Sequence, residues 1–228
     1  MNELITYFEQ GIIFQTYYAE YNYQIWKYIA NEYDFLITQP DDVQKMYAFI
    51  QSSSVTNFTL SFSRLFDKKD NKYPTMCLKS FLEKFELYFC ENLSYFEVNI
   101  EIRLLQNELI NMSKGNQIEQ YKDGIEDVRD YILSILKYYK QLIVNKENLL
   151  LIEKVRFIRD KQIAHNELVL NKEDIQRIDH SGINELLKVA NEIVSVFSLI
   201  IKQASYKLKE QAETDTCFIL NNIESIKR

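Results

Sequence analysis

The sequence holds few residues that interrupt helices and few that build metal or disulfide sites. Its 228 residues include only four glycines and two prolines, whereas 46% of the residues are hydrophobic. Few helix breakers among many helix formers predict an all-α protein. The three cysteines, Cys77, Cys90 and Cys217, are widely spaced and form no CxxC pair. This pattern argues against a zinc site or a disulfide framework and favours a reducing cytoplasm.

Other absences narrow the function. No apolar run approaches the roughly 18 residues of a membrane span, and the opening MNELITYFEQ lacks the pattern of a signal peptide. The sequence has no glycine-rich phosphate loop, no GxSxG, no HExxH and only two histidines, so we expect neither a metal nor another cofactor. The net charge of −6 disfavours a general nucleic-acid binder. We expect a cytoplasmic protein without a membrane partner.

Apolar residues recur at steps of three and four along most of the chain, which is the spacing of one helix face. The clearest example runs from Ile183 to Ile201. The predicted architecture is an antiparallel helical bundle with long central helices and an added helical pair. We expect one domain over residues 1–228, with a candidate helical insertion at about 91–145 and a C-terminal helix at about 211–228. Further helices are predicted over 3–37, from Pro40 to about Asp67 and over 147–165.

The stretch FIRDKQIAHNE holds the first candidate site, Arg159-Asp160-Lys161 followed by His165. A histidine can act as a general acid or base near neutral pH, and an arginine can stabilise charge on phosphate oxygens. On a continuous helix Arg159 and His165 would be separated by roughly 120°. They converge only if the helix ends or distorts near Ala164, or if a second subunit completes the site. The alternative is that Arg159 and Lys161 are solvated helix-end cations and His165 is a cap.

A second candidate is the polar ridge Ser61, Arg64 and Asp67, in the stretch SFSRLFDKKD. These residues fall at i, i+3 and i+6 on one helix face. The simplest interpretation is a structural ion pair between Arg64 and Asp67. The alternative is that the ridge meets the 147–165 helix and orients its arginine and histidine.

The same helix carries a small positive excess. Five basic residues, including Arg156, and three acidic ones lie between Lys146 and Lys161. A local basic patch can hold a few phosphates on an acidic protein, although most such runs are only a solvated helix face. We interpret the other histidine, His180, as a structural residue in a loop before the Ile183 helix.

The two motifs together resemble the HEPN superfamily, and more closely its AbiU-like abortive-infection branch. The matching residues are Arg64-Leu65-Phe66-Asp67 and, about ninety residues later, Arg159-Asp160-Lys161 with Ala164-His165. The resemblance runs from the tyrosine-rich first helix through Phe197 and implies a HEPN-type helical bundle.

What this resemblance implies is a metal-independent endoribonuclease that acts in phage defence or as a toxin. Two motifs would face each other across a homodimer formed through the motif helix. His165 would be the acid or base, Arg159 would stabilise developing charge, and Asp160 would help position the pair. Lys161, Arg156, Arg64 and Asp67 would bind RNA or support the site. The implied partners are RNA (tRNA or mRNA) and a candidate antitoxin or defence-system protein.

One feature of the sequence and one property of the superfamily bear on this expectation. HEPN toxins silenced by nucleotidyltransferase partners tend to have a tyrosine shortly after the histidine, whereas His165 is followed by Asn166-Glu167-Leu168. Silencing by adenylylation of such a tyrosine is therefore not expected here. Some superfamily members have lost nuclease activity, so the alternative function is a catalytically silent scaffold that binds nucleotide or protein partners in a defence complex.

Overall fold

The computed structural model describes residues 2–67, 76–100, 102–112, 128–160 and 180–225. All regular structure in these ranges is helical, which confirms the predicted all-α class. Its elements are α1 (Asn2–Thr6), the π-helical turn η1 (Tyr7–Ile13), α2 (Phe14–Asn31), α3 (Tyr33–Leu36), α4 (Asp41–Leu65), α5 (Leu78–Glu91), α6 (Leu93–Asn99), α7 (Ile102–Asn111), α9 (Val128–Ile143), α10 (Lys146–Ile158), α12 (His180–Lys202) and α13 (Leu208–Ser225).

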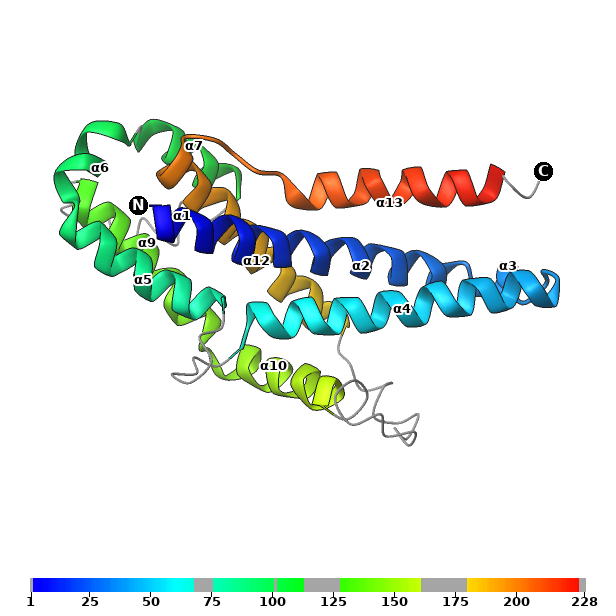
Figure 1. Cartoon of the computed structure of the whole chain (residues 1–228). Helices are drawn as coiled ribbons and strands as arrows, with labels where there is room; N and C mark the ends of the chain where they lie inside the picture. Colours follow the sequence, from blue (N-terminus) through cyan, green and yellow to red (C-terminus); the bar gives the residue numbers. More distant parts are fainter. Residues whose placement is uncertain (1, 68–75, 101, 113–127, 161–179, 226–228) are drawn as a thin grey trace.

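The longest part of the bundle is the antiparallel pair of α2 and α4 (Figure 1). Helix α13 lies along α2, on the side away from α4, and α10 packs against α4. Helix α12 contacts α2, α7 and α10. The prediction of long central helices in an antiparallel bundle is therefore confirmed.

The N-terminal segment differs from the single helix predicted over residues 3–37. A π-helical turn occupies Tyr7–Ile13, and the helix is interrupted again at Glu32, between α2 and α3. At Gly11 a Cβ atom would lie 2.7 Å from the Cβ of Met76, so only glycine fits this close approach. Next to it, the hydroxyl of Tyr7 accepts a 3.0 Å hydrogen bond from the backbone N–H of Cys77. These contacts attach the first turns to the start of α5.

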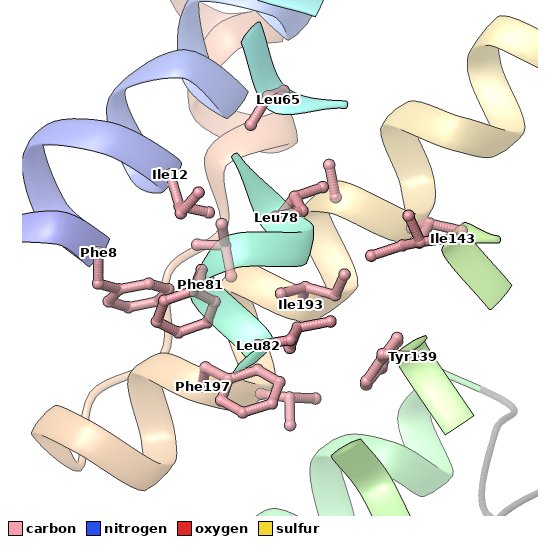
Figure 2. Packing of buried hydrophobic residues seen from close by; sticks show 14 of the residues in the cluster. Phe8, Ile12, Leu65, Leu78, Phe81, Leu82, Tyr139, Ile143, Ile193 and Phe197 are labelled. Carbon is pink, nitrogen blue, oxygen red and sulfur yellow. The ribbon is translucent and has the colours of Figure 1, made fainter. Parts of the chain in front are cut away.

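The core is built around α12, which is buried on nearly all of its sides. Phe197 of α12 meets Phe81 and Phe85 of α5 edge to face, with ring centroids 5.3 and 4.9 Å apart. Phe8 stacks on Phe81 from the other side at 4.8 Å (Figure 2). Burying each of these rings contributes on the order of 1.5–3 kcal/mol. The Ile183–Ile201 pattern was the clearest helical signal because it belongs to this central helix.

The segment predicted as a candidate insertion, 91–145, contributes to the same core. Phe96 of α6, Leu105 and Leu109 of α7, and Ile132 and Ile135 of α9 are all buried in the main apolar cluster. Its insertion in evolution stays a prediction, as does the single-domain organisation. The C-terminal helix begins at Leu208, earlier than predicted, because Leu208 and Ala212 are also buried.

Helices α4 and α10 bring the two motifs together. Helix α10 starts at an N-cap, Asn145, whose side-chain oxygen accepts a 2.8 Å hydrogen bond from the N–H of Asn148. Its buried face consists of Leu151, Ile152, Val155 and Ile158. The predicted helix over 147–165 is regular only to Ile158, and Arg159 and Asp160 lie in a π-type turn. The C-terminal end of α10 meets the C-terminal end of α4.

Candidate active site at the ends of helices α4 and α10

Asp67 lies two residues beyond the end of α4 and faces the last turn of α10. Its carboxylate oxygens are 3.7 Å from Nε of Arg156 and 3.5 Å from Nη1 of Arg159. About ninety residues of chain separate Asp67 from these arginines. One carboxylate therefore connects the two motifs.

Arg156 is the more deeply held of the two arginines. Its side chain is only 12% exposed, and its guanidinium donates a hydrogen bond to the backbone carbonyl of Phe66. Phe66 is the C-cap of α4, where carbonyl groups lack helical partners and favour a cation. Burial lowers the pKa of Arg156, and the neighbouring Asp67 acts in the opposite direction. Arg156 is thus placed to support the junction of the helices rather than to face solvent.

Arg159 is more open. Its side chain is 25% exposed, and its Nε donates a 2.8 Å hydrogen bond to Oδ1 of the exposed Asp160. With Asp67 on another side, the guanidinium is held between two carboxylates. This arrangement limits the rotamers of a long side chain while leaving part of the cation accessible.

We expected a structural ion pair between Arg64 and Asp67, but the structure pairs Asp67 with residues of α10 instead. Arg64 is exposed, and the ion pairs of Asp67 described here lead to α10. Helix α4 ends at Leu65, and Phe66 adopts φ −107° and ψ 18°, so Asp67 no longer follows the i, i+3 register from Arg64. The alternative was that the ridge meets the motif helix and orients its arginine and histidine. Of the ridge, Asp67 contacts the arginines of α10, whereas an effect on His165 stays a prediction.

Two of the predicted site residues, Lys161 and His165, lie outside the described residues, so their positions relative to Arg159 stay predictions. The interpretation of His180 as a loop residue was wrong, because it is the first residue of α12. Within the described ranges, no three His, Cys, Asp or Glu side chains gather in a way that could hold a metal ion.

The outer face of α10 was not anticipated. Leu150 is 53% exposed and Phe157 is 49% exposed, and at a spacing of seven residues they lie on the same face of the helix. Between them lie the exposed charges Glu153 and Lys154. A signal was present in the run Leu149-Leu150-Leu151-Ile152, because four consecutive apolar residues are more than one helix face can bury.

The structure is an all-α bundle in which Asp67, just after the end of α4, meets Arg159, just after the end of α10. The family model named AbiU2, of the HEPN domains, matches residues 2–216. The chain therefore belongs to the AbiU2 family, as the two motifs indicated. A comparison with curated proteins finds no match, and neither does one with solved structures. Among the helices that the structure describes, none has both the length and the apolar character needed to cross a membrane.

Proposed function

We propose that this protein is a metal-independent endoribonuclease of a phage-defence or toxin system. The observation that supports this most directly is the partly exposed side chain of Arg159, held by Asp67 and Asp160 at the end of the motif helix. A fixed cation of this kind suits the stabilisation of charge that develops in a transition state. Membership of a HEPN family supports a role in abortive infection.

The reaction we propose is cleavage of RNA by its own 2′-hydroxyl. His165 of one subunit accepts the proton of the 2′-hydroxyl as the 2′-oxygen forms a bond to the adjacent phosphorus. The bond from phosphorus to the 5′-oxygen breaks, and a second histidine donates a proton to that oxygen. Arg159 stabilises the negative charge on the phosphorane-like state. The products are a 2′,3′-cyclic phosphate and a 5′-hydroxyl end.

Each chain has one motif histidine, so we propose that the second comes from a homodimer built on α10. An antiparallel contact centred near Phe157, at the C-terminal end of α10, places Phe157 opposite Phe157 of the partner subunit. At 1.5 Å per residue, the two Arg159 residues are then about 6 Å apart along the helix axis. An isologous contact needs a self-complementary face, and the exposed Leu150 and Phe157 give α10 an apolar one.

The charges at the site also suit a small RNA footprint. Arg156 and Arg159 are balanced by Asp67 and Asp160, so attraction of the RNA backbone falls to exposed cations around them. Arg64 is an exposed residue of this kind. A few phosphate contacts give moderate, salt-dependent binding, which is compatible with an acidic protein.

The test is cleavage of tRNA and total RNA in EDTA by the wild type and by His165→Ala. We expect cyclic-phosphate and 5′-hydroxyl ends that vanish in the variant, while the oligomeric state is unchanged. His180→Ala is the matched control, because it removes the only other histidine and should retain cleavage. Equal cleavage by wild type and His165→Ala would refute the proposed site. No cleavage by either protein would favour the silent scaffold that binds nucleotide or protein partners.

A further inference from the structure

The end of the α2–α4 hairpin has an unusual concentration of exposed apolar side chains. We define the hairpin tip as residues 32–49, which comprise α3, the following turn and the first turns of α4. Its large exposed apolar residues are Tyr33, Phe35, Ile37, Met46 and Phe49. Phe49 is 73% exposed, although it lies in a regular helix. Clustered exposed apolar residues of this kind mark interaction sites more often than scattered ones do.

These side chains are not needed for the local core. The inner side of the tip has its own small cluster, in which Leu36 and Tyr47 pack with Ile25 and Ile29 of α2. Met46 and Phe49, three residues apart, lie on another face of α4 from the buried Tyr47. The tip therefore has an inner apolar side that folds the hairpin and an outer one directed to solvent.

The turn of the tip is held by hydrogen bonds from its own side chains. The side-chain amide of Gln44 donates to the carbonyl groups of Gln39, at 2.7 Å, and Ile37, at 3.2 Å. Thr38 Oγ1 donates to the carbonyl of Phe35 at 2.7 Å. A surface that is already ordered loses less conformational entropy on binding. The tip thus has the properties of a preformed docking surface.

The charge of the tip restricts what it can bind. Residues 32–49 contain four acidic residues, Glu32, Asp34, Asp41 and Asp42, and one basic residue, Lys45. Lys45 forms an ion pair with Asp41 at 2.5 Å. A second copy of the tip would bring like charges together, and both RNA and anionic lipid carry the same sign. Complementary charge is found on a basic protein surface.

We propose that the hairpin tip docks a basic, amphipathic helical segment of another protein. Apolar residues of that segment would cover Met46 and Phe49, and its lysines or arginines would meet Asp34 and Asp42. Exposed aromatic residues are the type that most often dominates binding at interfaces. The 25 residues of α4 span about 37 Å at 1.5 Å per residue. The tip is therefore at the far end of α4 from Asp67, on the right of Figure 1, and a partner there would leave α10 uncovered.

The experiment uses the full chain and a fluorescent 18-residue helical peptide, with leucine on one face and lysine on the other. A peptide with glutamate in place of lysine is the control for charge. We expect the basic peptide to bind, and its affinity to fall at least tenfold in Phe49→Ser and in the double variant Asp34→Asn with Asp42→Asn. The acidic peptide should bind at least tenfold more weakly than the basic one.

Matched substitutions elsewhere separate docking from general stickiness. Leu87→Ser removes a similarly exposed apolar residue on α5, and Glu91→Gln with Asp130→Asn makes the same change in net charge away from the tip. We expect both to bind the basic peptide as the wild type does. No binding, or equal losses in tip and control variants, would overturn the proposal. Loss of self-association in Phe49→Ser would show that a second copy occupies the tip, which would also overturn it. None of these outcomes depends on RNA cleavage.

Discussion

The carboxylate of Asp67, just after the end of α4, lies 3.5 Å from the guanidinium of Arg159, just after the end of α10. The same carboxylate is 3.7 Å from Arg156, which in turn donates a hydrogen bond to the carbonyl before Asp67. The two motifs are therefore parts of one junction. We therefore predict a different effect of substitution at Asp67, Arg156 and Arg159.

Asp67→Asn should reduce RNA cleavage about tenfold through kcat, with a much smaller change in KM. The variant keeps the size of the side chain but removes the charge that restrains Arg159, and a misplaced catalytic group costs rate more than binding. Steady-state kinetics on a short RNA would measure this. Asp130→Asn, an exposed substitution elsewhere, is the control. A rise in KM with unchanged kcat would show that Asp67 acts in binding instead.

Arg156→Met should lower the free energy of unfolding by about 1–3 kcal/mol, because it leaves the Phe66 carbonyl without its donor and removes one of the ion-pair partners of Asp67. Arg159→Met should cost less than about 1 kcal/mol, since that ion pair is more exposed. Urea denaturation of both variants provides the comparison. A larger loss for Arg159→Met would contradict the supporting role that the structure indicates for Arg156.

Arg159→Lys should lose most of the cleavage rate while RNA affinity changes little. Lysine keeps the charge but not the planar, forked set of donors that suits phosphate oxygens in a transition state. Single-turnover rates and binding to a 2′-deoxy RNA analogue measure the two quantities separately. Equal losses in rate and affinity would assign Arg159 to substrate binding instead.

The proposed dimer should depend on the exposed apolar side chains near the end of α10. Phe157→Asp places like charges opposite each other at the centre of the contact, so it should dissociate the dimer and abolish cleavage. Leu87→Asp, at an exposed apolar position on α5, is the control and should change neither. Sedimentation velocity measures the dimer, and a cleavage assay on RNA measures the activity. A dimer that survives Phe157→Asp would contradict the contact through α10.

The buried Glu20 predicts a pH dependence of stability. Burial raises the pKa of this carboxyl above its ordinary value near 4.5, although hydrogen bonds from Gln24 and Asn191 oppose the shift. A raised pKa means that the native state binds the proton more tightly than the unfolded state. The contribution of Glu20 to stability is therefore full at low pH and falls as pH rises through the elevated pKa.

The measurement is the unfolding free energy of wild type and Glu20→Gln between pH 4 and pH 7. We expect the difference to shift in favour of the variant as pH rises. Gln24→Ala is the control, because it removes one of the opposing hydrogen bonds and should raise the pKa of Glu20 further, moving the change to higher pH. A difference that does not vary with pH would contradict the assignment.

The sequence by itself determined the helical class, because scarce glycine and proline and apolar steps of three and four are local properties of the chain. It also determined the family, since the Arg-Leu-Phe-Asp and Arg-Asp-Lys motifs stand in the right order, and the family model spans 2–216. The Ile183 helix was identified for the same local reason. These features need no knowledge of which segments meet.

Only the tertiary structure decided which cations form ion pairs with Asp67. Arg64 is the cation of α4 nearest to Asp67 in the sequence. The described ion pairs of Asp67 nevertheless lead to Arg156 and Arg159, because α4 ends at Leu65 and α10 packs across that end. The π-helical turn at Tyr7–Ile13 and the exposed face of α10 were likewise seen only in the structure. Periodicity reports which side of a helix is apolar. It does not report which neighbour covers that side, because this depends on contacts between residues far apart in the chain.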